Sequence, residues 1–105
     1  MHLTSFLQDG HLTIALSGEI DHHCAKRYIN TITSKIEVYS PKHCILDFQE
    51  VTFMDSSGIA VVINALRLMK KMNGSVSLTG LQDQPMKVFR ASGIDKLVSI
   101  KETVL

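Results

Sequence analysis

Residues 44–59, CILDFQEVTFMDSSGI, run from an apolar segment into the start of a helix, and they decide the fold. The first five residues form a short apolar run of the kind that makes a buried strand. Beyond the segment, apolar residues recur at helical spacing on one face, namely Ile59, Val62, Ile63, Leu66, Met69 and Met72. The pattern therefore predicts a helix from about Ser57 to Met72, ended by Asn73-Gly74.

The polar group at the start of this helix has two interpretations. Asp55, Ser56 and Ser57 are all residue types that cap helices by accepting a hydrogen bond from a free backbone N–H. Capping requires only one such side chain, and here three stand together. One hydroxyl is then left for chemistry at a place where backbone N–H groups are expected to be free. The pattern alone does not say which serine caps.

The rest of the chain alternates between strand and helix patterns. A hairpin turns at Asp9-Gly10, its second strand ends at Gly18, and Asp21 is the expected N-cap of the first helix. The expected elements are strands at 3–8, 12–17, 44–48, 75–79 and 97–100, and helices at 25–36, 57–72 and 85–92. The order β-β-α-β-α-β-α-β predicts one α/β domain over residues 1–105, with a small mixed, largely parallel sheet and helices packed on it.

This topology has a functional consequence. The carboxyl ends of parallel strands lie at one edge of a sheet, and sites gather there. Residues 18–21 and 53–57 end two such strands and should share that edge. Asp21 and Ser57 are therefore expected to be neighbours.

The composition excludes several classes of function. The chain has 105 residues and a formal net charge of +1, which provides no strong field for nucleic acid or an acidic membrane. No segment reaches the about 18 apolar residues of a membrane span, and no secretion signal is visible. The two cysteines, Cys24 and Cys44, are scattered, which suits a cytoplasmic protein.

Three kinds of chemistry fit the sequence poorly. A serine hydrolase at Ser57, with His22 or His23 as base, lacks the G-x-S-x-G motif. Nucleotide binding lacks both G-x-G-x-x-G and the Walker lysine pattern. None of the five histidines has zinc-ligand spacing, these being His2, His11, His22, His23 and His43. We expect no catalytic residue, no metal and no cofactor.

A binding module with a modifiable serine fits better. A phosphate on Ser57 would sit at a helix N-terminus, where N–H donors and the helix dipole favour an anion. It would add roughly −1.5 to −2 charges at pH 7. Met54 and Ile59 flank the serine and are expected to supply apolar contact to a partner, while Asp21 and Asp55 add negative charge.

At this point two motifs match a family. Gly18-Glu19-Ile20-Asp21-His22-His23 followed by Phe53-Met54-Asp55-Ser56-Ser57-Gly58-Ile59 resembles the anti-sigma factor antagonists, the STAS-domain proteins of Gram-positive bacteria. The likeness runs nearly end to end, includes the late Ser92-Gly93-Ile94, and is strongest to the sporulation members. Ile20 and Ile59 stand where leucine is common in the family.

The resemblance implies a partner switch. The unmodified antagonist binds an anti-sigma factor that is also a serine kinase, and this frees a sigma factor. The kinase phosphorylates the second serine of the motif, here Ser57, and a PP2C-type phosphatase restores it. Such an antagonist is a substrate and a ligand, not an enzyme. The expected partner-binding residues are Asp21, Met54, Asp55, Ser56, Gly58 and Ile59. A general-stress antagonist and a STAS subunit of a transport system are the alternatives.

Overall fold

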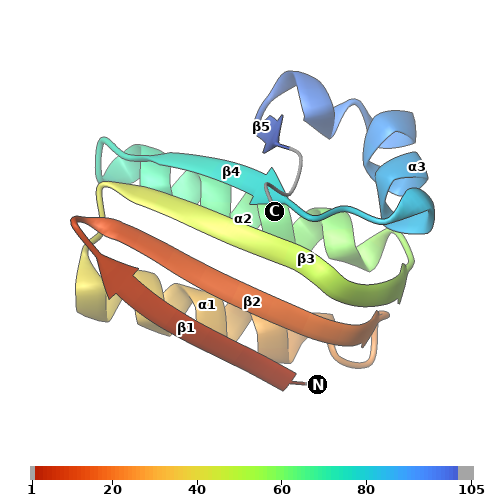
Figure 1. The fold of residues 1–105 in the computed structure, drawn as a ribbon, viewed down its shortest axis with the longest axis horizontal. Helices are drawn as coiled ribbons and strands as arrows, with labels where there is room; N and C mark the ends of the chain where they lie inside the picture. The colour runs from red at the N-terminus through yellow and green to blue at the C-terminus, as the bar shows by residue number, and fades with distance from the viewer. Residues whose placement is uncertain (1, 102–105) are drawn as a thin grey trace.

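Five strands form one sheet in the order β1-β2-β3-β4-β5 in the computed structural model, which describes residues 2–101 (Figure 1). β1 pairs antiparallel with β2, and the remaining neighbours are parallel. The elements are β1 His2–Gln8, β2 His11–Ile20, α1 Ala25–Tyr39, β3 His43–Met54, α2 Ser57–Lys71, β4 Ser75–Thr79, α3 Asp83–Ser92, the 3₁₀ turn η1 Ile94–Lys96 and β5 Ser99–Lys101. The predicted mixed, largely parallel sheet and the order of strands and helices are confirmed, while η1 was not predicted.

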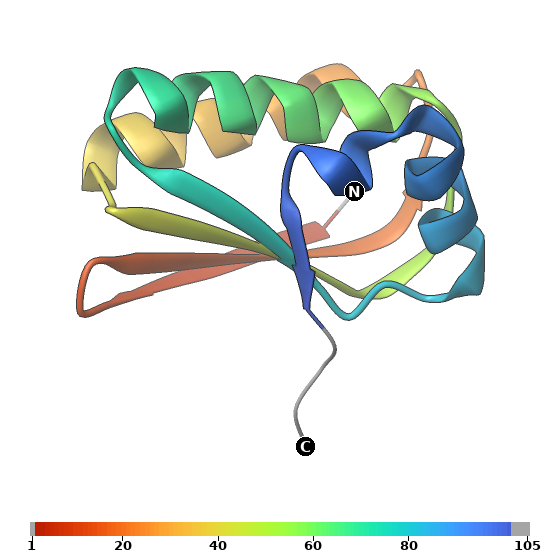
Figure 2. The ribbon, with the colours of Figure 1, turned by 90° about the horizontal axis from the view of Figure 1, so that it is seen from above.

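The long helices α1 and α2 lie side by side on one face of the sheet (Figure 2). The strands alternate accordingly, and β2 turns Leu12, Ile14 and Leu16 toward the helices, where all three are buried. From α1, Tyr28 and Ile32 fill the same core. This amphipathic layering follows from strand period two meeting helix period 3.6.

The buried face of α2 differs from the predicted one. The residues that are buried are Gly58, Val61, Val62, Ala65, Leu66 and Met69. Ile59, Ile63 and Met72 lie half-buried at the rim of the core instead. The buried stripe includes Gly58 and Ala65, and small residues let a helix approach a sheet closely.

β2 and β3 run several residues beyond their predicted ends. β2 does not end at Gly18, because that residue takes a φ of +85° and forms a bulge, after which pairing with β3 resumes. β3 continues past Phe48 to Met54 through the exposed residues Gln49 and Glu50. The apolar run therefore covered only the first half of β3.

The short helix α3 lies beside the carboxyl end of β3 (Figure 1). Phe89 of α3 is fully buried and packs edge-to-face on Phe48 of β3, with ring centroids 5.4 Å apart. Gly93 ends the helix with a φ of +80°, as its position predicted. Among residues 2–101, no helix is both long and apolar enough to cross a membrane.

Candidate functional site

The carboxyl ends of β2 and β3 meet at one edge of the sheet. Ile20 pairs with Met54 in the parallel register, and the Asp55 N–H then donates to the carbonyl of Ile20 at 3.1 Å. The polar residues after both strands are thereby brought together. The predicted shared edge is confirmed.

Asp55 organises the start of α2. Its Oδ1 accepts a hydrogen bond from the Ser57 N–H at 2.8 Å. This bond is the main cause of a lowered pKa for the Asp55 carboxyl, although partial burial opposes it. Hydrogen bonds from the Ser57 hydroxyl and the His22 N–H lower the pKa further, and the charge of Asp21 raises it. Asp55 thus joins the end of β2 to the helix that carries Ser57.

Asp21 closes the turn before α1 instead of capping the helix directly. The helix begins at Ala25 with Cys24 in the N-cap position, so the predicted role of Asp21 as N-cap is wrong by three residues. Its Oδ1 accepts from the N–H groups of His23 at 3.0 Å and Cys24 at 3.2 Å. Burial raises the pKa of Asp21, but hydrogen bonds from Cys24 and His23 outweigh it, and the pKa is lowered. Asp21 and Asp55 are both ionised at neutral pH.

The first N–H groups of α2 are already occupied, contrary to the expectation that they would be free. The Ser57 N–H binds the Asp55 carboxylate, the Gly58 N–H binds the Asp55 carbonyl at 3.1 Å, and the Ile59 N–H binds the Ser56 carbonyl at 3.1 Å. Ser56, at the N-cap position, makes no side-chain capping bond within the described residues. The capping acceptor is therefore Asp55, and Ser56 is exposed beside a half-buried Ser57.

Met54 and Gly58 do not offer contact surface. Met54 is 0% exposed, so the expectation that its side chain touches a partner is wrong. Gly58 is also buried, and a Cβ placed on it would come within 2.6 Å of the Met54 methyl carbon. Both residues act beneath the surface by seating α2 on β3. Ile59 keeps part of its side chain outside the core.

Phe53 supplies the exposed apolar surface that Met54 does not. Its side chain is 41% exposed, and it pairs with Glu19 next to the acidic edge. Strand alternation turns it away from Met54. This orientation depends on the register of β3 beyond the bulge in β2, and the apolar pattern of the sequence does not encode it.

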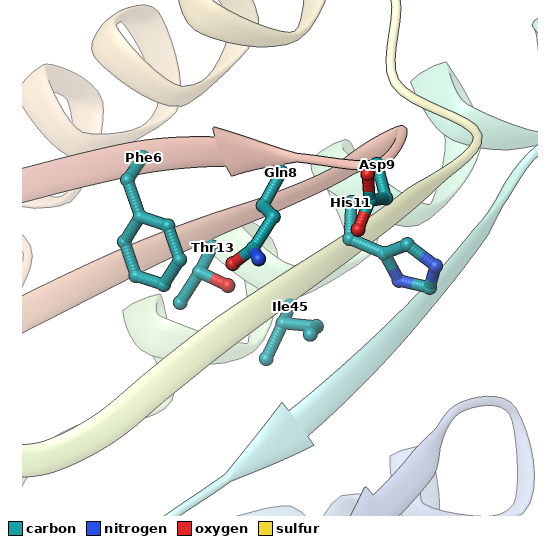
Figure 3. Close-up of a pocket in the computed structure, with 6 residues that line it drawn as sticks. All are labelled: Phe6, Gln8, Asp9, His11, Thr13 and Ile45. Carbon is teal, nitrogen blue, oxygen red and sulfur yellow. The ribbon is translucent and has the colours of Figure 1, made fainter.

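A hollow lies elsewhere on the molecule, away from Ser57 (Figure 3). It measures about 330 Å³ and is lined by Phe6, Gln8, Asp9, His11, Thr13 and Ile45. These residues sit around the β1–β2 hairpin turn, at the end of β2 opposite to Ile20. The hollow is therefore separate from the edge that carries Ser57.

With this geometry established, comparison with known proteins identifies the family. The family description "STAS domain" matches residues 7–105. The chain belongs to the STAS domain family. In sequence, this STAS domain is 31% identical over 94 residues to an anti-sigma-B factor antagonist of Listeria monocytogenes, covering 87% of this chain and 79% of the relative. It is 28% identical over 91 residues to an anti-sigma F factor antagonist of Paenibacillus polymyxa, covering 87% and 78%.

A solved structure agrees with these relatives. The unphosphorylated anti-sigma factor antagonist SpoIIAA superimposes with a TM-score of 0.84 and 25% identity, over 98% of this chain and 89% of that one. The resemblance to anti-sigma factor antagonists in the two motifs thus extends to the whole fold of the STAS domain.

Proposed function

We propose that this STAS domain is an anti-sigma factor antagonist switched by phosphorylation of Ser57. The unphosphorylated domain binds an anti-sigma factor that is also a serine kinase, and this binding releases a sigma factor. The kinase phosphorylates Ser57, the modified domain dissociates, and a PP2C-type phosphatase restores it. In this cycle the domain is a cytoplasmic substrate and ligand without catalysis of its own.

The observation that carries the proposal is the position of Ser57 against Asp55. The hydroxyl stands at the start of α2 and hydrogen-bonds a carboxylate that is ionised at neutral pH. A phosphate there is favoured by the helix dipole, but it lies against the Asp55 carboxylate with Asp21 close by. The N–H groups of Ser57, Gly58 and Ile59 are already bonded to other acceptors. Negative charge therefore accumulates at one point of the surface.

This accumulation of charge explains the loss of binding. A partner that covers the site must desolvate the phosphate and tolerate its repulsion, and like charges at an interface cost several kcal/mol. Since each 1.4 kcal/mol is tenfold in affinity, the phosphorylated form should bind about a hundredfold more weakly or worse. The contact surface we propose comprises Phe53 and Ile59 as apolar residues, with Asp21, Asp55 and Ser56 around them.

The sporulation pathway is our first assignment, because His22-His23 follows Asp21 as in the sporulation antagonists that the motifs resemble. The identity to an anti-sigma-B factor antagonist supports a general-stress antagonist as the second. Titration of the domain with an anti-sigma factor kinase of each type distinguishes them.

The central test is phosphorylation with ATP and the cognate anti-sigma factor kinase, followed by intact mass and site mapping. Ser57→Ala should abolish phosphate incorporation with the fold retained, and Ser56→Ala is the matched control that should still be modified. Ser57→Asp should weaken partner binding, and so should Asp21→Ala. Phosphate mapped to Ser56 or Ser92, or equal affinity of the two forms for the partner, would refute the proposal.

A further inference from the structure

The second half of β3 lacks a strand neighbour on the side of β4. Among the described residues, the pairing with β4 covers His43–Asp47, whereas β3 continues to Met54. Two glutamines at the start of α3 hydrogen-bond the exposed edge instead. Gln82 Nε2 donates to the carbonyl of Gln49 at 2.7 Å.

Gln84 makes the more complete contact. Its Oε1 accepts from the Met54 N–H at 2.8 Å, and its Nε2 donates to the Met54 carbonyl at 2.8 Å. A primary amide can present one acceptor and one donor side by side, so it pairs with both backbone groups of one residue as a neighbouring strand would. Met54 is buried, so these backbone groups would lack good partners if the amide were removed.

The residue that Gln84 holds is the anchor of the phosphoacceptor segment. Met54 directly precedes Asp55, whose carboxylate binds the Ser57 N–H. The Met54 side chain also lies under Gly58, where no Cβ would fit. Fixing Met54 therefore fixes the segment at its first residue and, through that side chain, just beyond Ser57.

We infer that Gln84 is a positioning residue for Ser57: its amide holds the segment 54–58 in the conformation that presents the serine. The consequence for phosphoryl transfer rests on the proposed function, whereas the conformational claim does not. The Gln84 side chain thereby couples the position of α3 to the presentation of Ser57, although Gln84 and Ser57 are far apart in sequence.

The chain contains its own control. Gln82 and Gln84 are the same residue type, both stand at the start of α3, and both hydrogen-bond the backbone of β3. Gln82, however, binds the carbonyl of Gln49, away from the serine. If glutamines here only protected the edge of β3, Gln82→Ala and Gln84→Ala would behave alike. Gln84→Glu is a second variant of equal length that keeps the acceptor and loses the donor to the Met54 carbonyl.

The first measurement is amide hydrogen exchange by NMR on the isolated domain, which needs no partner. Loss of a buried hydrogen bond should lower protection of the Met54 and Ser57 amides about tenfold in Gln84→Ala. In Gln84→Glu a carboxylate oxygen faces the Met54 carbonyl and repels it, so the contact should open and protection of the same two amides should fall as well. Gln82→Ala should leave both amides within about twofold of the unmodified domain, since it removes no bond to them. Should Gln84→Ala fail to fold, Gln84→Glu gives the same comparison.

The second measurement is the rate of Ser57 phosphorylation by the anti-sigma factor kinase. Misplacing a reacting group by about 1 Å can cost up to a hundredfold, so kcat/KM should fall about tenfold or more in both Gln84 variants and stay near normal in Gln82→Ala. Unchanged exchange at Met54 and Ser57, or equal effects of Gln82→Ala and Gln84→Ala, overturns the inference. So does a normal phosphorylation rate in the Gln84 variants. A starting domain that the kinase does not phosphorylate overturns the proposed function, and the exchange data still decide the role of Gln84.

Discussion

Replacing Gly58 by alanine probes the contact that seats α2 on β3. A Cβ at this position would stand 2.6 Å from the methyl carbon and 2.9 Å from the sulfur of Met54. Real Cβ atoms do not approach so closely, so the thioether must move. Because Met54 is fully buried, it has no solvent to move into and must displace other core side chains.

Two opposing terms set the magnitude. Overpacking of a filled core costs about 1–3 kcal/mol. Alanine is the better helix former, and in a helix interior it gains up to about 1 kcal/mol over glycine, less in the first turn. The net expectation for Gly58→Ala is a loss of about 1–2 kcal/mol, which lowers the melting temperature of a domain of this size by about 4–16 °C.

A double-mutant cycle tests the reasoning. Met54→Val removes the two atoms that the new Cβ would approach most closely, so in that background Gly58→Ala should be neutral or stabilise the domain by up to about 1 kcal/mol. Urea unfolding of the four proteins gives the coupling energy, expected at about 1–3 kcal/mol. If Gly58→Ala costs the same with valine at position 54, or costs nothing with methionine there, Met54 is not what requires the glycine.

Three further outcomes are expected. Burial raises the pKa of the Cys44 thiol from 9.0 to about 12. Between pH 9 and pH 12 this thiol therefore ionises in the unfolded chain but not in the folded domain. The free energy of unfolding is not affected by the thiol below pH 9, and above pH 9 it falls by about 1.4 kcal/mol per pH unit. Urea titrations at pH 8 and 10 should show this loss in the unmodified domain and not in Cys44→Ala; an identical pH dependence of both would contradict it. Phe53→Ser should weaken binding of the anti-sigma factor about tenfold or more, as loss of an aromatic contact does. The control Val38→Ser, with a residue that is 73% exposed in the last turn of α1, should not. Treatment with a chelator should leave the melting temperature and partner binding unchanged, and a fall of several degrees would reveal a required metal.

The layers of the fold were predictable because they follow from local periodicity. The alternation in β2 decides its buried face, the helical spacing after Ser57 locates α2 and part of its buried face, and the order of elements then favours a parallel sheet. The length of β3 was not predictable in this way. Its second half pairs with a bulged β2, so Val51 and Met54 are buried at a spacing of three instead of two. A strict period of two stops at Phe48.

The motif gave the location of the site but not the role of each residue. Ser57 and Asp55 lie where strand–helix topology predicted. Whether Met54 or Phe53 faces outward depends on the register beyond the bulge, which the pattern does not encode. The bonds between Gln84 and Met54 join residues thirty positions apart and leave no periodic signal.

Under the proposed switch, the arrangement of anchors would let a modification of Ser57 change binding without unfolding the domain. The segment is held at Met54 by α3, at Asp55 by β2 and at Gly58 by packing on Met54. None of these contacts uses the Ser57 hydroxyl. A phosphate on that oxygen removes its hydrogen bond to Asp55 and repels the carboxylate, but it leaves the anchors from α3 and β2 in place. The added charge is therefore unfavourable mainly in the complex, where a partner covers it. In the free domain, water still screens the phosphate from Asp55 and Asp21.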